Sequence, residues 1–207
     1  MELKILHWFE ELHNPVLDFL MYQITCLGNG GLIWLVIAAA MLFVLPKRYR
    51  KTGATVVAAL LISLVICNGI MKNLYQRVRP FHADSTFENL YRVFDRIYDW
   101  SFPSGHTATA FMGAELLRRE YWNVSPWIGI AGYAVAAGTG LFRIYNNRHW
   151  LTDVLAGAGV GILSVQAAYW LYPAISKTFF HKQYLKNTFI SPYMSEQSKG
   201  LSCTITF

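Results

Sequence analysis

The chain has 207 residues, of which 54% are hydrophobic and only 14% are charged. Soluble domains carry about 25% charged residues, so this chain lacks the surface charge of a soluble domain and its composition indicates a membrane protein. The net charge of +6 does not favour a nucleic-acid partner, because the basic residues cluster at the ends of apolar segments, where they fit membrane topology and an anion site better.

Apolar stretches that can cross a bilayer follow one another along the chain, since a transmembrane helix needs roughly 20 residues. Five are clear, at 30–45, 54–74, 104–117, 127–142 and 151–172. The segment 14–27 is only moderately apolar and contains Asp18 and Gln23. It is a sixth span, a half-inserted helix or an interfacial helix, and we favour a sixth span. The expected fold is an all-α polytopic membrane bundle of about six transmembrane helices. Five of them are clear, and the sequence does not decide whether the N-terminal one crosses the membrane.

This bundle is expected to form one membrane-embedded domain over residues 1–180, followed by a polar, loosely ordered tail over 181–207. Polar and apolar positions alternate at helical spacing in 88–100. That pattern predicts either an amphipathic helix at the membrane interface or a loop helix that packs on the bundle. Gly157 and Gly161 form a G-x-x-x-G pattern in an apolar helix, which permits close helix packing.

Three polar segments lie at the ends of the spans: Lys72–Pro80, Pro103–His106 and Arg143–Asp153. No apolar run long enough to cross lies between the first two, and two short spans separate the second from the third. All three segments therefore meet at one membrane face.

The loops at the other face carry a group of basic residues: Lys47, Arg48, Arg50, Lys51, Arg118 and Arg119. Cytoplasmic loops carry the excess of Lys and Arg, so we expect the three segments on the non-cytoplasmic face. For a bacterial protein this means the inner membrane, with the site facing the periplasm.

The first segment supplies two cations, Lys72 and Arg79, seven positions apart. They share a helix face if the helix continues, but Pro80 disfavours helix at Arg79. We therefore expect Arg79 where the helix ends, at the interface. The alternative is that both cations merely extend from a span end to the water.

The second segment is expected to begin a helix at Ser104, in the N-cap position. Backbone N–H groups of a first helical turn, here including Gly105 and His106, bind anions, and glycine lets a phosphate approach closely. His106 can give a proton to a leaving oxygen. The alternative is an ordinary cap with an interfacial histidine.

The third segment places His149 four residues before Asp153, which puts both on one face of a helix. A carboxylate bonded to one ring nitrogen fixes the tautomer and leaves the other nitrogen as acceptor or nucleophile. Arg143 has the planar fork that matches phosphate oxygens. The alternative is that His149 and Trp150 form an interfacial anchor pair.

In this order, the segments resemble the signature of the type 2 phosphatidic acid phosphatase (PAP2) family, K-x6-R-P, P-S-G-H and S-R-x5-H-x3-D. The match runs from Lys72 to Asp153 and departs at Phe142, where the family has Ser. The resemblance implies an integral membrane phosphatase acting on a lipid phosphate or diphosphate, such as undecaprenyl diphosphate, phosphatidylglycerol phosphate, phosphatidate or lipid A. Loss of one neutral hydrogen bond at Phe142 costs about 0.5–1.5 kcal/mol, so activity is expected to survive.

The resemblance also implies a role for each residue. His149 attacks phosphorus and carries a phosphohistidine, Asp153 orients it, and His106 protonates the departing oxygen and then activates water. The phosphate oxygens are held by Lys72, Arg79, Ser104, Gly105 and Arg143. Neither a cofactor nor a metal is expected, because these cations neutralise the charge and no carboxylate cluster suits Mg²⁺.

Two other functions compete with this one. A vanadium haloperoxidase resembles the same signature, but those enzymes look soluble and the apolar spans argue against it. A non-catalytic lipid-binding or lipid-moving protein is disfavoured because His106, His149 and Asp153 are all present. The expected partners are a lipid phosphate substrate and membrane lipids, without nucleic acid.

Overall fold

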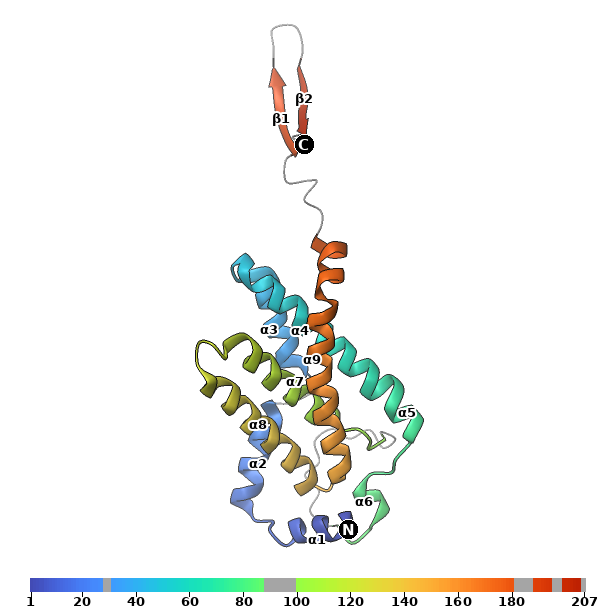
Figure 1. Ribbon diagram of the computed structural model, residues 1–207. Helices are drawn as coiled ribbons and strands as arrows, with labels where there is room; N and C mark the ends of the chain where they lie inside the picture. Colours follow the sequence, from blue (N-terminus) through green and yellow to red (C-terminus); the bar gives the residue numbers. More distant parts are fainter. Residues whose placement is uncertain (28–30, 88–99, 181–187, 195–198, 206–207) are drawn as a thin grey trace. The chain divides into compact units, whose positions relative to one another are not determined.

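The computed structural model describes residues 1–27, 31–87, 100–180, 188–194 and 199–205 (Figure 1). The chain divides into two compact units, Met1–Tyr169 and Trp170–Phe207. Residues 88–99, which carry most of the predicted amphipathic helix, lie outside the described residues.

Helices make up the first unit. They are α1 (Glu2–Glu10), α2 (Pro15–Leu27), α3 (Leu32–Ala39), α4 (Arg50–Leu64), α5 (Lys72–Tyr75), α6 (Pro80–Ala83), α7 (Gly105–Tyr121), α8 (Pro126–Tyr145) and α9 (Leu151–Phe180), the last of which continues into the second unit. Three further helical segments are Ala40–Val44, Lys47–Tyr49 and Val65–Met71.

Within the described residues, three helical runs are long and apolar enough to cross a membrane: Lys47–Ala83, Pro126–Tyr145 and Leu151–Ala174. Leu32–Val44 is a shorter apolar helix. The predicted all-helical membrane bundle is confirmed for this part of the chain. A count of six crossings, with 14–27 as the sixth, stays a prediction.

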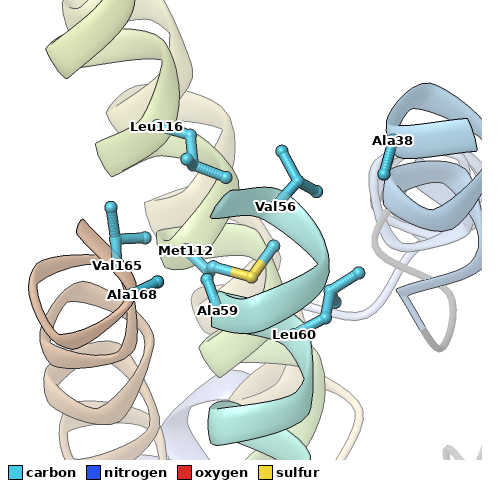
Figure 2. Packing of buried hydrophobic residues seen from close by; sticks show 8 residues of the cluster. All are labelled: Ala38, Val56, Ala59, Leu60, Met112, Leu116, Val165 and Ala168. Carbon is cyan, nitrogen blue, oxygen red and sulfur yellow. The ribbon is translucent and has the colours of Figure 1, made fainter. Parts of the chain in front are cut away.

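The bundle core lies where α3, α4, α7 and α9 meet. Its buried residues are Ala38, Val56, Ala59, Leu60, Met112, Leu116, Val165 and Ala168. Figure 2 shows Met112 of α7 among side chains of α4 and α9. Many of these residues are small, and small side chains let helices approach closely in a membrane. Gly113 is an extreme case, because a Cβ there would lie 1.8 Å from the Trp34 ring.

The two basic loops, before α4 and after α7, lie at one end of the bundle. Thr52 Oγ1 donates a hydrogen bond to Glu120 (3.0 Å). The cations of Lys51 and Arg119 lie over the Tyr169 ring, 6.0 and 4.4 Å from its centre. The loops before α4 and after α7 therefore lie at the same end, in agreement with the predicted topology.

The opposite end holds α1 and the start of α2. Glu2 accepts a hydrogen bond from the backbone N–H of Thr152 at the start of α9 (3.0 Å). The Nε2 atom of His13 lies 2.9 Å from the carbonyl oxygen of Tyr145 at the end of α8. The first helix thus packs beside the loop that joins α8 to α9.

The second unit contains a β-hairpin of β1 (Thr188–Met194) and β2 (Lys199–Ile205), antiparallel, with Ser191 opposite Ser202. The loose order expected for the tail stays a prediction, although these two segments have extended, paired backbone. Their β-branched and aromatic residues favour extended backbone, a local preference that the overall polarity of the tail conceals. The domain boundary at 180 stays a prediction.

Candidate active site

The first segment reaches the site by a different path from the one predicted. The helix that carries Lys72 ends at Tyr75, because Gln76 adopts a left-handed backbone (φ 44°). Arg79 follows in extended conformation as the N-cap residue of α6. Arg79 was expected where this helix ends, and the helix ends earlier, at Tyr75, so the condition under which Lys72 and Arg79 would share one helix face is not met.

Arg79 nevertheless arrives next to the predicted nucleophile. Its side chain is buried, with 7% of its surface exposed. Its Nη1 atom donates to the carbonyl oxygen of Arg148 (3.1 Å) and lies 3.4 Å from Nε2 of His149. The first segment therefore contacts the third through the loop before α6, and not through a continuous helix.

The two ring nitrogens of His149 face opposite kinds of partner. Nδ1 lies 3.5 Å from Oδ2 of Asp153 and 3.4 Å from Oγ of Ser101. Nε2 faces the guanidinium of Arg79, which can only donate. This arrangement assigns the proton to Nδ1 and the lone pair to Nε2. A lone pair directed at a cationic site is what a nucleophile for phosphorus requires.

The pairing of His149 with Asp153 is present, although the two residues do not share a helix. Helix α9 begins at Leu151, after His149. Asp153 lies in the first turn, and its Oδ2 atom accepts the backbone N–H of Trp150 (2.9 Å). The carboxylate therefore caps α9 and reaches back to the histidine, as in a capping box.

Two partners of Asp153 were not predicted from the sequence. Arg77 Nη1 donates to Oδ1 (2.7 Å), and the Ser101 hydroxyl donates to Oδ2. The carboxylate is fully buried, so these donors compensate its desolvation. Arg77 is one of the unspecified positions of K-x6-R-P, and Ser101 precedes P-S-G-H, so the motif pattern gave no signal for either.

The N-cap prediction for Ser104 is confirmed. Its Oγ accepts the backbone N–H and the hydroxyl of Thr107 (3.4 and 2.9 Å). Its own N–H donates to the carbonyl oxygen of Asp153 (3.0 Å), which joins the second segment to the third. A Cβ built on Gly105 would have no heavy atom of the described residues within 4 Å, apart from its chain neighbours and the backbone of its own helix. This space leaves room for an anion at the start of α7.

The G-x-x-x-G pattern packs α9 against the backbone of α7. A Cβ on Gly157 would lie 2.4 Å from the carbonyl oxygen of Ser104, and one on Gly161 would lie 2.2 Å from that of Ala108. Only glycine permits this approach, so the pattern holds the P-S-G-H turn against α9.

Arg143 and the remaining predicted residues gather around the same point. Arg143 is 7% exposed, and its carbonyl oxygen accepts the N–H groups of Arg148 and His149 (both 3.1 Å). The charges of Lys72, Arg79 and Arg143 act on His149, and the same three charges act on His106. The predicted residues are therefore brought together, while their individual roles stay predictions.

Phe142 is buried against an aromatic neighbour. It is 1% exposed and stacks on Tyr145, with ring centres 6.4 Å apart. A phenyl ring offers phosphate no hydrogen bond, so this position fills the core. Among the described residues, no group of three His, Cys, Asp or Glu side chains is placed to hold a metal ion.

The environment of His149 keeps its imidazole neutral. Burial lowers the pKa of His149 well below 6.5, and the nearby charges of Arg79 and Arg143 lower it further. A neutral ring retains its lone pair at neutral pH.

This pKa predicts how stability depends on pH. Below about pH 6.5 the unfolded chain binds a proton at this histidine that the folded protein does not. The contribution to stability is therefore complete above pH 6.5 and is lost as the pH falls. We expect the thermal unfolding midpoint in detergent to decrease from pH 6.5 to 5 by more in the wild type than in His149→Gln. Equal decreases would contradict the assignment.

Apolar helices long enough to cross a membrane indicate an integral membrane protein, and the buried cations beside a helix N-terminus at one end are suited to an anion. The family model of the PAP2 superfamily matches residues 52–177, and the chain belongs to this superfamily.

Relatives and a solved structure agree with this assignment. Lipid A 1-phosphatase of Porphyromonas gingivalis is 59% identical over 71 residues, which are 34% of this chain and 16% of that protein. Undecaprenyl-diphosphatase of Sulfolobus acidocaldarius is 33% identical, over 65% of this chain and 63% of that protein. The crystal structure of Aquifex aeolicus LpxE is 25% identical with a TM-score of 0.67, over 82% of this chain and 94% of that one.

Proposed function

We propose that the protein removes a phosphate from a lipid phosphate or lipid diphosphate through a phosphohistidine at His149. The observation that carries the proposal is the orientation of this ring. Nε2 faces Arg79 (3.4 Å), and Nδ1 faces Asp153 and Ser101. The names of the relatives, which include a lipid A phosphatase and an undecaprenyl-diphosphatase, support a lipid substrate.

In the first step, Nε2 of His149 attacks phosphorus while the bond from phosphorus to the leaving oxygen breaks. Asp153 accepts the Nδ1–H and stabilises the positive charge that develops on the ring. His106 gives its proton to the leaving oxygen. Fixed cations and N–H groups stabilise the negative oxygens of the transition state; they belong to Lys72, Arg79, Arg143 and the first turn of α7.

In the second step, water replaces the histidine. His106, now neutral, takes a proton from water as its oxygen attacks phosphorus, and the bond between phosphorus and Nε2 breaks. Inorganic phosphate leaves, and His149 returns to the neutral state with its proton on Nδ1. Each step is a displacement at phosphorus, which needs positioning and charge stabilisation more than new covalent chemistry.

An apolar groove next to the site supports a substrate with hydrocarbon chains. It has a volume of about 210 Å³ and lies between α3, α7 and α8. Ala110 and Thr139 line it, one helical turn from His106 and Arg143 respectively. The lining of this groove is almost entirely apolar, which suits an acyl or prenyl chain of a lipid whose phosphate is held at the site.

We infer that the protein lies in a bacterial inner membrane, with the site on the periplasmic face. The basic loops at the other end of the bundle support this orientation, since such loops stay in the cytoplasm.

The test is phosphate release from a panel of undecaprenyl diphosphate, phosphatidylglycerol phosphate, phosphatidate and lipid A in detergent, with and without EDTA. We expect release from at least one lipid, unchanged by EDTA, because arginine and lysine hold the phosphate. Inhibition by EDTA would overturn the metal-independent mechanism. Bromide oxidation with vanadate and no phosphate release would favour a haloperoxidase instead.

A further inference from the structure

Arg77 connects the site to the N-terminal helix. Its Nη1 atom donates to Asp153 Oδ1 (2.7 Å), and its Nη2 atom donates to Glu2 Oε2 (2.6 Å). Its guanidinium also lies over the Trp150 ring, 4.9 Å from the ring centre. A planar fork is needed to hold two carboxylates and an aromatic face at once.

The backbone of Arg77 fixes the other partner of the histidine. Its carbonyl oxygen accepts the N–H of Ser101 (2.8 Å). The Ser101 hydroxyl then donates to Asp153 and lies 3.4 Å from Nδ1 of His149. Both groups that face Nδ1 therefore depend on Arg77, one through its side chain and one through its backbone.

Glu2 extends this arrangement to α9. Its Oε1 atom accepts the N–H and the hydroxyl of Thr152 (3.0 and 2.9 Å), while Oε2 accepts from Arg77. A carboxylate at a helix N-terminus satisfies free N–H groups and interacts favourably with the helix dipole. Glu2 thus fixes the first turn of α9, which carries Asp153, and holds the guanidinium of Arg77 in place.

We propose that Arg77 and Glu2 are positioning residues for the phosphatase reaction, an inference that rests on the proposed function. Arg77 holds the carboxylate of Asp153 directed at Nδ1, so that Nε2 of His149 points at the phosphate. Without Arg77, a fully buried carboxylate loses its counter-charge and its orientation. Because their contacts are with Asp153 and with the start of α9, both residues are expected to act on turnover and not on binding.

The test compares kcat and KM of purified full-length variants with one lipid phosphate that the wild type hydrolyses. We expect Arg77→Gln to lower kcat about 10- to 100-fold, a loss of the size seen when a group that orients a metal-bound side chain is removed, with KM within about twofold of the wild type. Arg77→Lys should recover part of kcat, since it restores the charge without the fork. Glu2→Gln should cost less, and adding it to Arg77→Gln should cost little more, because the two act through one contact.

Arg119→Gln is the matched control. Arg119 also bonds a polar side chain, Gln166 Oε1 (2.6 Å), and lies over an aromatic ring, but at the other end of the bundle. Its kcat should equal that of the wild type. If Arg77→Gln keeps its kcat, or if KM rises while kcat stays, the positioning role is overturned and the phosphatase activity stands. If the wild type releases no phosphate from any lipid, both proposals fail.

Discussion

Replacement of His149 by alanine is expected to reduce phosphate release by about 10⁴-fold or more, a loss typical for removal of an enzyme nucleophile. In the proposed mechanism Nε2 of this ring is the atom that becomes bonded to phosphorus, and alanine offers no atom that can take its place. Rapid acid-free quenching of the wild type with labelled substrate should trap one phosphoryl group per protein, and none in His149→Ala. Thermal unfolding in detergent shows whether the variant is folded.

His106→Ala provides the complementary experiment. With p-nitrophenyl phosphate, whose leaving group needs no proton, the first step should survive in this variant while hydrolysis of the phosphohistidine slows. A burst of nitrophenolate equal to the protein concentration is therefore expected. Full steady-state activity in His149→Ala would contradict the covalent mechanism, and a linear, fast release in His106→Ala would contradict the second role of His106.

Gly157→Ala is expected to destabilise the protein and to slow phosphate release by displacing the P-S-G-H turn. The new Cβ would lie 2.4 Å from the Ser104 carbonyl oxygen, so the turn must move away from α9. Overpacking of this kind costs about 1–3 kcal/mol of unfolding free energy, and a displacement near 1 Å at a catalytic site costs about 10²-fold in rate. Thermal unfolding and phosphate release measure the two effects.

Gly159→Ala is the control for this variant. It adds the same methyl group to the same helix, but the described residues leave its Cβ without a neighbour within 4 Å. Alanine also favours helix over glycine by about 1 kcal/mol, so this variant should be at least as stable as the wild type and equally active. Equal behaviour of the two variants would show that close packing of α9 on the turn does not matter.

Much of the arrangement could be predicted from the sequence, because hydrophobicity and sequence order determine which loops share a membrane face. The helix start at Ser104 was also predictable, since a serine after a proline and before an apolar run is a strong N-cap signal. Counting spans was enough to bring Lys72, His106 and His149 to one end.

The remainder depends on tertiary contacts that leave no periodic pattern. The helix that carries Lys72 ends at Tyr75, before Gln76. No proline or glycine lies at this position, so the sequence predicts a helix end that is too close to Arg79. Ser101 and Arg77 are ordinary polar residues in loops, and only the folded chain brings them to Asp153. Glu2 is still harder to foresee, because its partner Thr152 lies 150 positions away along the chain.

The length of α7 has a consequence for how the protein meets its substrate. Its 17 residues span about 26 Å, which is less than the roughly 30 Å of a bilayer's hydrocarbon core. In the proposed orientation, with α7 crossing the bilayer, a helix of this length keeps the turn at Ser104 level with the lipid headgroups. The substrate diffuses to the site in two dimensions, and the rate should follow the mole fraction of the lipid in the membrane or micelle. Dilution with inert detergent at constant bulk concentration then slows the reaction.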